Sequence, residues 1–193
     1  MEKIRAFIAI ELPEAVRAAL SLVQSRLRAE RHSYVKWVDP GGVHLTLKFL
    51  GNIDAGQVSA LSDAIGQAAQ GVAPFRLELG ETGAFPNQRR PNVIWVAVTG
   101  DVERLASLQR AIDQLLIPLG FVPESRPFSP HLTLGRLKER ASTAERQKIG
   151  ESLATVKPEA VHFQANEISL MRSTLTPSGA IYSRISSVSL KAA

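Results

Sequence analysis

The tetrapeptide His-Leu-Thr-Leu occurs twice in this chain, and it restricts the fold more than any other feature. One copy spans residues 44–47 and the other residues 131–134, in a sequence that contains only four histidines. Successive side chains of a β-strand point to opposite faces, so each histidine shares a face with its threonine while the leucines take the other. Each copy therefore predicts a strand that buries two leucines and presents an imidazole beside a hydroxyl.

The two copies occupy equivalent places in two similar series of predicted elements. The first half predicts strands at 4–11, from His44 and at 74–80, with helices at 13–28 and from Val58. The second half predicts strands at 92–99, from His131, at about 161–171 and at 180–190, with helices from Asp101 and from Ser142 to about 156. The motif histidines are 131 − 44 = 87 residues apart, which is close to half of the 193-residue chain. We therefore predict an α+β fold built from a duplicated β-α-β-α-β unit, with two pseudo-symmetric lobes around a central cleft.

Charge and composition narrow the class of partner. The net charge of +5 and the pI of about 9.9 favour nucleic acid or a nucleotide over a membrane surface, although a basic surface that serves only solubility is the alternative. The absence of cysteine excludes disulfides, thiol nucleophiles and cysteine-bound metals. The apolar run at 7–10 is too short for a signal peptide or a membrane span, so we expect a cytoplasmic protein.

The paired motifs indicate acid and base catalysis around a shared anion. If the two units pack about a pseudo-twofold axis, His44 and Thr46 face their second-half counterparts, His131 and Thr133, across the cleft. Two imidazoles can take opposite protonation states, and two hydroxyls can donate to the oxygens of a phosphate. No zinc-binding histidine spacing, nucleophile elbow, Walker A or dinucleotide glycine pattern is present. We therefore expect in-line displacement at phosphorus without a metal or another cofactor.

The sequence resembles the 2H phosphoesterases, a family named for two His-x-Thr-x motifs, and within it the bacterial RNA 2′,3′-cyclic phosphodiesterases, also called 2′-5′ RNA ligases. The likeness extends over nearly the whole chain. It includes the opening Arg5-Ala6-Phe7-Ile8-Ala9-Ile10, the extension Lys48-Phe49-Leu50-Gly51 after the first motif, the central Phe85-Pro86 and Arg90-Pro91, and Gly135-Arg136 after the second motif.

The resemblance implies a single bilobal domain over 1–193 that hydrolyses a terminal 2′,3′-cyclic phosphate of RNA or a nucleotide to a 2′-phosphate, with no metal. It further implies that His44 donates a proton, that His131 accepts one, and that Thr46 and Thr133 bind phosphate oxygens. We expect a monomer. ATP-independent 2′-5′ ligation of RNA ends and a non-catalytic RNA-binding module are the alternatives.

Further phosphate-binding candidates follow each motif. Lys48 keeps the parity of His44 if the strand is uninterrupted, which would place its ammonium near the phosphate; a solvated lysine is the alternative. Arg136 has the wrong parity relative to His131, but Gly135 can mark a bulge that turns it inward, and the resemblance favours a phosphate contact.

The remaining aromatic residues and histidines give weaker signals. Trp37, Phe7 and Tyr182 are candidates to stack on a base, although aromatic residues in apolar strands usually belong to the core. The other two histidines, His32 and His162, are expected to be structural or exposed.

Overall fold

The fold is described from a computed structural model, which covers residues 2–30, 32–177 and 179–192. Its strands are β1 (Lys3–Glu11), β2 (Val35–Trp37), β3 (His44–Asp54), β4 (Phe75–Phe85), β5 (Val93–Gly100), β6 (His131–Leu137), β7 (His162–Ala165), β8 (Glu167–Thr176) and β9 (Gly179–Ser189). Its α-helices are α1 (Glu14–Ala29), α2 (Val58–Ala69), α3 (Val102–Leu116) and α4 (Thr143–Thr155). Within these ranges, no helix has the length and apolar character needed to cross a membrane.

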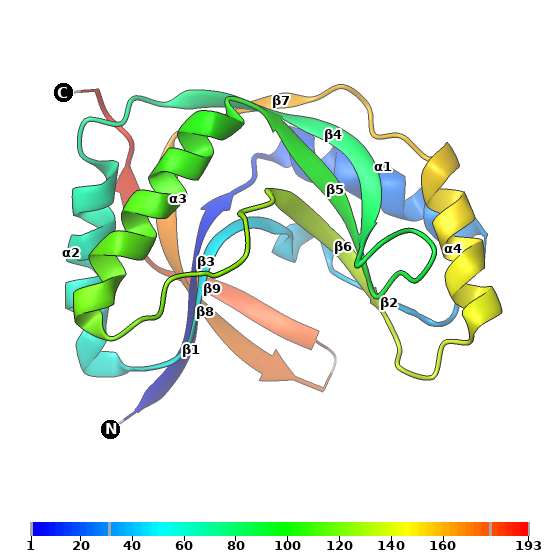
Figure 1. Ribbon diagram of the computed structural model, residues 1–193, viewed down its shortest axis with the longest axis horizontal. Helices are drawn as coiled ribbons and strands as arrows, with labels where there is room; N and C mark the ends of the chain where they lie inside the picture. The colour runs from blue at the N-terminus through cyan, green and yellow to red at the C-terminus, as the bar shows by residue number, and fades with distance from the viewer. Residues whose placement is uncertain (1, 31, 178, 193) are drawn as a thin grey trace.

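The strands form two antiparallel sheets, which confirms the α+β class and the duplication. One sheet has the order β3-β1-β8-β9 and the other the order β2-β6-β5-β4-β7 (Figure 1). The first unit contains β1, β3 and β4, and the second contains β5, β6 and β8. In each sheet the motif strand pairs with the first strand of its own unit, which pairs in turn with the third strand of the other unit, giving β3-β1-β8 and β6-β5-β4. Each unit therefore contributes its third strand to the sheet of the other unit. Neither sheet therefore coincides with one half of the sequence, and the motif strand β3 lies at the edge of its sheet.

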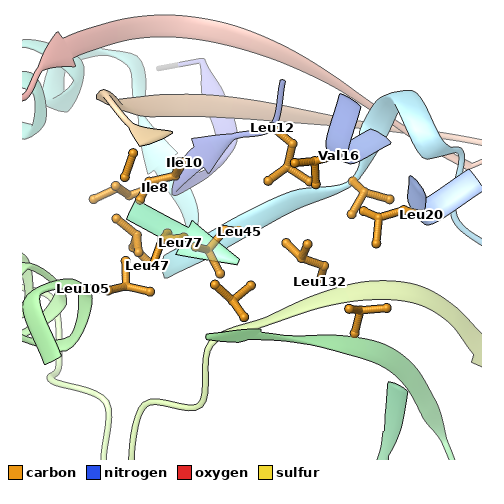
Figure 2. Close-up of a cluster of buried hydrophobic side chains, with 14 of the residues drawn as sticks. Ile8, Ile10, Leu12, Val16, Leu20, Leu45, Leu47, Leu77, Leu105 and Leu132 are labelled. Carbon is orange, nitrogen blue, oxygen red and sulfur yellow. The ribbon is translucent and has the colours of Figure 1, made fainter. Parts of the chain in front are cut away.

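The helices are exchanged between the units in the same way. Helices α2 and α3 contact each other and cover the sheet that contains β3, whereas α1 and α4 contact each other and cover the sheet that contains β6 (Figure 1). Gln24 of α1 donates from Nε2 to the carbonyl oxygen of Leu134 at 2.8 Å, which fixes this helix against the second motif strand. Helix α3 contacts β3, and Leu105 of α3 belongs to the same buried cluster as Leu47 of the first motif strand (Figure 2).

The leucines of both motifs are buried in one shared core, as their alternation predicted. Leu45 and Leu132 are fully buried, and both appear in the cluster of side chains drawn in Figure 2. The same core includes residues of both sheets and of all the α-helices named above. Strands β3 and β6 also contact each other.

Two predicted segments differ from the structure. The single strand predicted at 161–171 is wrong: the chain forms β7 in one sheet and β8 in the other, with Asn166 between them. No glycine or proline separates the two strands, so the sequence gives no turn signal at the crossing between sheets. Strand β2, which pairs with β6 through Trp37 and Gly135, lies between the predicted helix at 13–28 and the predicted strand from His44, where no strand was predicted.

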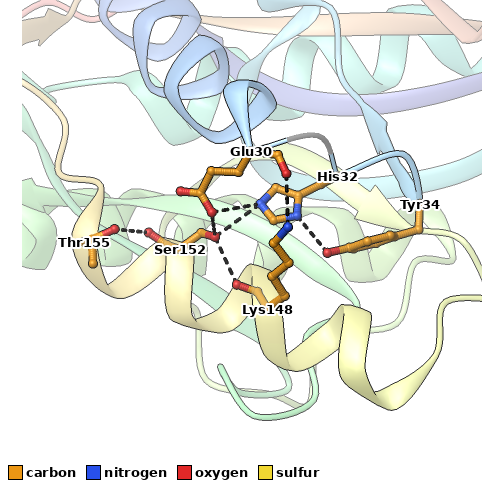
Figure 3. Close-up of polar contacts among 6 residues, drawn as sticks. All are labelled: Glu30, His32, Tyr34, Lys148, Ser152 and Thr155. Atoms are coloured by element: carbon orange, nitrogen blue, oxygen red, sulfur yellow. Dashed lines mark hydrogen bonds and ion pairs between the residues drawn. The ribbon is translucent and has the colours of Figure 1, made fainter.

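His32 is structural, as expected. Its side chain is buried after the end of α1, with Nδ1 2.7 Å from the Tyr34 hydroxyl and Nε2 3.2 Å from the Ser152 hydroxyl (Figure 3). Glu30 also accepts a hydrogen bond from Ser152 of α4. This cluster ties the end of α1 to α4. The predicted start of α4 is confirmed by a capping box, in which the Ser142 hydroxyl accepts from the backbone amide three residues later.

Candidate active site

Strand β3 changes side-chain parity between the first motif and the residues that follow it. Ile8 of β1 faces Lys48, whereas the next residue of β1 faces Thr46, so one residue of β3 is left over between them. Such a bulge reverses the parity of the strand beyond it. Phe49, rather than Lys48, therefore lies on the face that carries His44 and Thr46. We call this face, and the face of β6 that carries His131 and Thr133, the histidine faces.

Strand β6 contains the equivalent bulge. Its register against β5 shifts by one residue between Thr133 and Gly135, which leaves Leu134 as the extra residue. The predicted bulge is therefore confirmed, and it places Arg136 on the histidine face. The Arg136 side chain is exposed, and no carboxylate among the described residues pairs with it. A Cβ atom on Gly135 would lie 2.9 Å from Val35 Cγ1, so glycine permits β2 to approach at this point.

The two motif imidazoles are held by the same contact. His44 Nδ1 lies 2.8 Å from the carbonyl oxygen of Gly42, and His131 Nδ1 lies 2.6 Å from that of Ser129, in each case two residues before the histidine. A carbonyl oxygen can only accept a hydrogen bond, so Nδ1 carries the proton in the neutral ring. Nε2 is therefore the atom of each imidazole that can exchange a proton with another molecule.

Aromatic rings pack against both imidazoles. The Phe7 ring stacks on His44 with centroids 4.4 Å apart, and Tyr182 meets the same imidazole edge-on at 4.8 Å. Phe85 meets His131 edge-on at 4.9 Å. Two of the predicted base-stacking residues, Phe7 and Tyr182, thus contact a motif histidine. The third, Trp37, is partly buried, and its ring lies 5.4 Å from the Arg28 guanidinium.

The electrostatic surroundings of His44 include a carboxylate that the sequence did not indicate. Burial lowers the pKa of His44, while the Gly42 carbonyl and the charge of Glu11 act in the opposite direction. Glu11 faces His44 across the β1–β3 pairing and accepts hydrogen bonds from Ser169 at 2.6 Å and Arg184 at 2.7 Å. The net effect favours the neutral imidazole when no ligand is bound.

Lys48 lies in a buried ion pair on the opposite face of β3. Its ammonium is 2.7 Å from Asp113 Oδ1 in α3 and donates to the carbonyl oxygen of Val122 at 2.7 Å. Both charged side chains are only 9% exposed. The premise that Lys48 keeps the parity of His44 on an uninterrupted strand is therefore wrong. The ammonium instead fixes the loop that precedes the second motif strand.

The structure places the remaining predicted groups on two adjacent strands. Thr46 and Thr133 are partly buried, and neither hydroxyl has a hydrogen-bond partner within the described part of the chain. His44 and Thr46 lie on β3, while His131, Thr133 and Arg136 lie on β6, which contacts β3. Across residues 2–30, 32–177 and 179–192, no three His, Cys, Asp or Glu side chains are grouped to hold a metal ion.

Comparisons with known proteins agree with this arrangement. A family model described as LigT like phosphoesterase matches the chain twice, at residues 10–95 and 96–182. A relative from Methanothermobacter thermautotrophicus, named RNA 2′,3′-cyclic phosphodiesterase, is 36% identical over 181 residues, which is 93% of this chain and 95% of the relative. A relative of the same name from Aquifex aeolicus is 31% identical and covers 94% of this chain and 95% of its own length.

Solved structures give the same result for the fold. A crystal structure from Thermus thermophilus superposes with a TM-score of 0.80 at 31% identity, over 98% of this chain and 99% of the other. E. coli LigT complexed with 3′-AMP superposes with a TM-score of 0.75 at 25% identity, over 98% of this chain and 99% of the other. The two matches of the family model correspond to the two motif-bearing halves.

Proposed function

The chain belongs to the family of LigT-like phosphoesterases, and on this basis we propose that it hydrolyses the terminal 2′,3′-cyclic phosphate of RNA or of a nucleotide to a 2′-phosphomonoester. Its relatives are named for the cyclic phosphodiesterase reaction, and a related structure contains a bound nucleotide. We further propose that 1–193 is a single bilobal domain, which is supported by the core that the two sheets share.

In the proposed reaction, the Nε2 atoms of the two imidazoles transfer the protons. His131 accepts a proton from water as the water oxygen forms a bond to phosphorus, and His44 donates a proton to O3′ as the P–O3′ bond breaks. The cyclic phosphate is thereby opened to a 2′-phosphate and a free 3′-hydroxyl. One imidazole begins charged and the other neutral, and they end in the opposite states.

Hydroxyl and guanidinium donors stabilise the phosphate in this proposal. Thr46 and Thr133 donate to its non-bridging oxygens, and the exposed guanidinium of Arg136 compensates the charge that develops on them. Lys48 is not included, because its ammonium is paired with Asp113. The anionic substrate beside His44 favours the protonated imidazole, and so opposes the effect of burial on the pKa of His44.

One observation supports the proposal above all others: each motif histidine is oriented by the backbone carbonyl two residues before it, which leaves Nε2 free. An RNA-binding module has no need for two imidazoles held in one tautomer. The test is incubation of the purified protein with a short RNA that ends in a 2′,3′-cyclic phosphate. The same RNA ending in a 3′-phosphate and a variant lacking both histidines serve as controls. Opening of the cyclic end by the unmodified protein alone is expected, and an intact cyclic end would refute the proposal.

A further inference from the structure

Strand β2 adds a lysine to the sheet face that carries His131. Lys36 lies directly opposite Arg136 in the antiparallel pairing of β2 with β6, and residues placed in this way point to the same side of a sheet. The two neighbours of Lys36 in β2 point to the other side, because Val35 is buried and Trp37 packs against the core. Lys36 therefore shares the histidine face with Arg136.

These two cations repel each other, and no other group of the described chain compensates them. Like charges directly opposite each other on neighbouring strands are destabilising. Both side chains are exposed, and neither has an ion-pair or hydrogen-bond partner within 2–30, 32–177 and 179–192. On the other side of β6, Arg136 faces Val93, which has no charge. Lys138 differs, because it donates to the carbonyl oxygen of Ser33 at 2.9 Å. An anion from outside the chain would relieve the repulsion between the two cations.

The pair of cations continues the row of polar side chains that begins at the second motif. His131, Thr133 and, after the bulge, Arg136 follow one another on the histidine face of β6. Lys36 lies one strand further on, and neighbouring strands are about 4.8 Å apart. Strand β2 is the outermost strand of this sheet (Figure 1). The row therefore leads from the proposed position of the cyclic phosphate to the edge of the sheet.

We propose that Lys36 binds the phosphodiester that joins the last two nucleosides of an RNA ending in a 2′,3′-cyclic phosphate. This inference deepens the proposed function and rests on it. An RNA strand carries one negative charge for each nucleoside, so a chain whose terminal phosphate lies at the motifs brings its next charge one nucleoside away. The ammonium of a lysine is a flexible point charge that binds a phosphate without a fixed geometry. Lys36 would thus favour an RNA end over a mononucleotide, which lacks this phosphodiester.

The test uses three substrates that separate the charge of the phosphodiester from the second nucleoside. Adenosine 2′,3′-cyclic phosphate has no phosphodiester, and the dinucleotide ApA with a 2′,3′-cyclic phosphate end has one. The methylphosphonate analogue of this dinucleotide has the same two nucleosides but no charge between them. We measure kcat/KM at low ionic strength for the unmodified protein, Lys36→Gln and Lys36→Arg. Lys191→Gln is the matched control, because it removes the same charge from an exposed lysine that pairs with Gln70 after α2.

We expect Lys36→Gln to lower kcat/KM for the charged dinucleotide by about 3- to 10-fold, mainly through KM, because one exposed contact between a cation and a phosphate is lost. The effect on the uncharged analogue and on the mononucleotide should be smaller, and Lys36→Arg should retain most of the activity on the charged dinucleotide. A loss of less than about threefold on the charged dinucleotide, an equal loss on its uncharged analogue, or an equal loss in Lys191→Gln would overturn the inference.

Failure of the proposed function gives a different result. If the unmodified protein hydrolyses none of the three substrates, the proposed function fails, and a binding measurement then decides the role of Lys36. Fluorescence anisotropy measures the affinity for a labelled oligoadenylate that ends in a 2′-phosphate, at low ionic strength. Weaker binding by Lys36→Gln than by Lys191→Gln supports the phosphodiester site, and equal binding by the two variants overturns it.

Discussion

The buried ion pair between Lys48 and Asp113 provides a test of the bulge in β3, because the bulge makes Lys48 structural. Asp113→Leu would leave the ammonium buried with only the Val122 carbonyl as a partner. Lys48→Met would be less damaging, because Asp113 Oδ2 still accepts from Gln109 and from the backbone amide of Glu124, each at 3.1 Å. The two single substitutions should therefore differ in their effect on stability.

The magnitude follows from the burial of both groups. Leaving one charge of a buried pair without its partner costs about 3–5 kcal/mol, and we expect Asp113→Leu to reach this range and Lys48→Met to stay below it. The double variant removes both charges while keeping similar side-chain volumes. Its free energy of unfolding should lie at least about 2 kcal/mol closer to that of the unmodified protein than the sum of the single losses predicts.

Urea denaturation measures the four unfolding free energies, and hydrolysis of a cyclic phosphate measures function in the same samples. Lys157→Met is the control, because this side chain is 74% exposed and its loss should cost less than about 0.5 kcal/mol. The folded double variant should keep kcat within about tenfold of the unmodified value, because the ammonium of Lys48 is paired with Asp113 on the face of β3 opposite to the histidine face. Additive stability losses, or a fall of more than about 100-fold in kcat of the folded double variant, would refute the reasoning.

The remaining predictions concern the catalytic groups and the response to pH. His44→Ala and His131→Ala should each lose at least about 10²-fold in kcat with the fold retained. The variant with both substitutions should be little worse than the less active single variant. Normal turnover by a single variant would exclude a proton-transfer role for the histidine that it lacks. Thr46→Val and Thr133→Val should lower kcat by a smaller factor, and losses as large as those of the histidine variants would contradict their role as phosphate-binding donors. Turnover should survive EDTA, and activity that disappears and returns on adding a divalent ion would contradict the imidazole mechanism. Burial lowers the pKa of His32 from its ordinary 6.5, so the folded state takes up fewer protons than the unfolded state and stability is lost as the pH falls below that value. Thermal unfolding should show this loss between about pH 7.5 and pH 5.5, and His32→Gln should reduce it; an unchanged slope would be inconsistent with the buried neutral imidazole.

The alternating side chains of each motif made the core and the two histidine faces predictable. The alternation of leucine and threonine specifies which face of each strand is buried. The equivalent positions of the two motifs within the two series of predicted elements specify the duplication. The exchange of third strands was not predictable, because the same β-α-β-α-β pattern is compatible with a sheet made from one unit or from both. The boundary between strands at Asn166 was not predictable either, because no glycine or proline separates β7 from β8.

The bulges determine on which face of its strand each secondary candidate lies. Gly135 gave a signal for the bulge in β6, which puts Arg136 on the histidine face. No glycine or proline marks the equivalent point between Thr46 and Lys48, so the strand was treated as uninterrupted. Phe49 and Arg136 are also 87 residues apart, like the two motif histidines. The amino-acid sequence therefore indicates that these two residues occupy equivalent places in the two units. The pairing of His44 with Glu11 across β1 and β3 depends on strand register, which one sequence does not reveal.

Hydrolysis of an RNA with a 2′,3′-cyclic end in ¹⁸O-labelled water tests the central claim most directly. Chromatography separates 2′- and 3′-phosphate ends, and mass spectrometry locates the label. If His131 activates water and His44 protonates O3′, the product is a 2′-phosphate that carries one ¹⁸O atom on phosphorus. A mainly 3′-phosphate product would contradict the assignment of donor and acceptor, and an unlabelled 2′-5′ linkage between RNA ends would contradict hydrolysis itself.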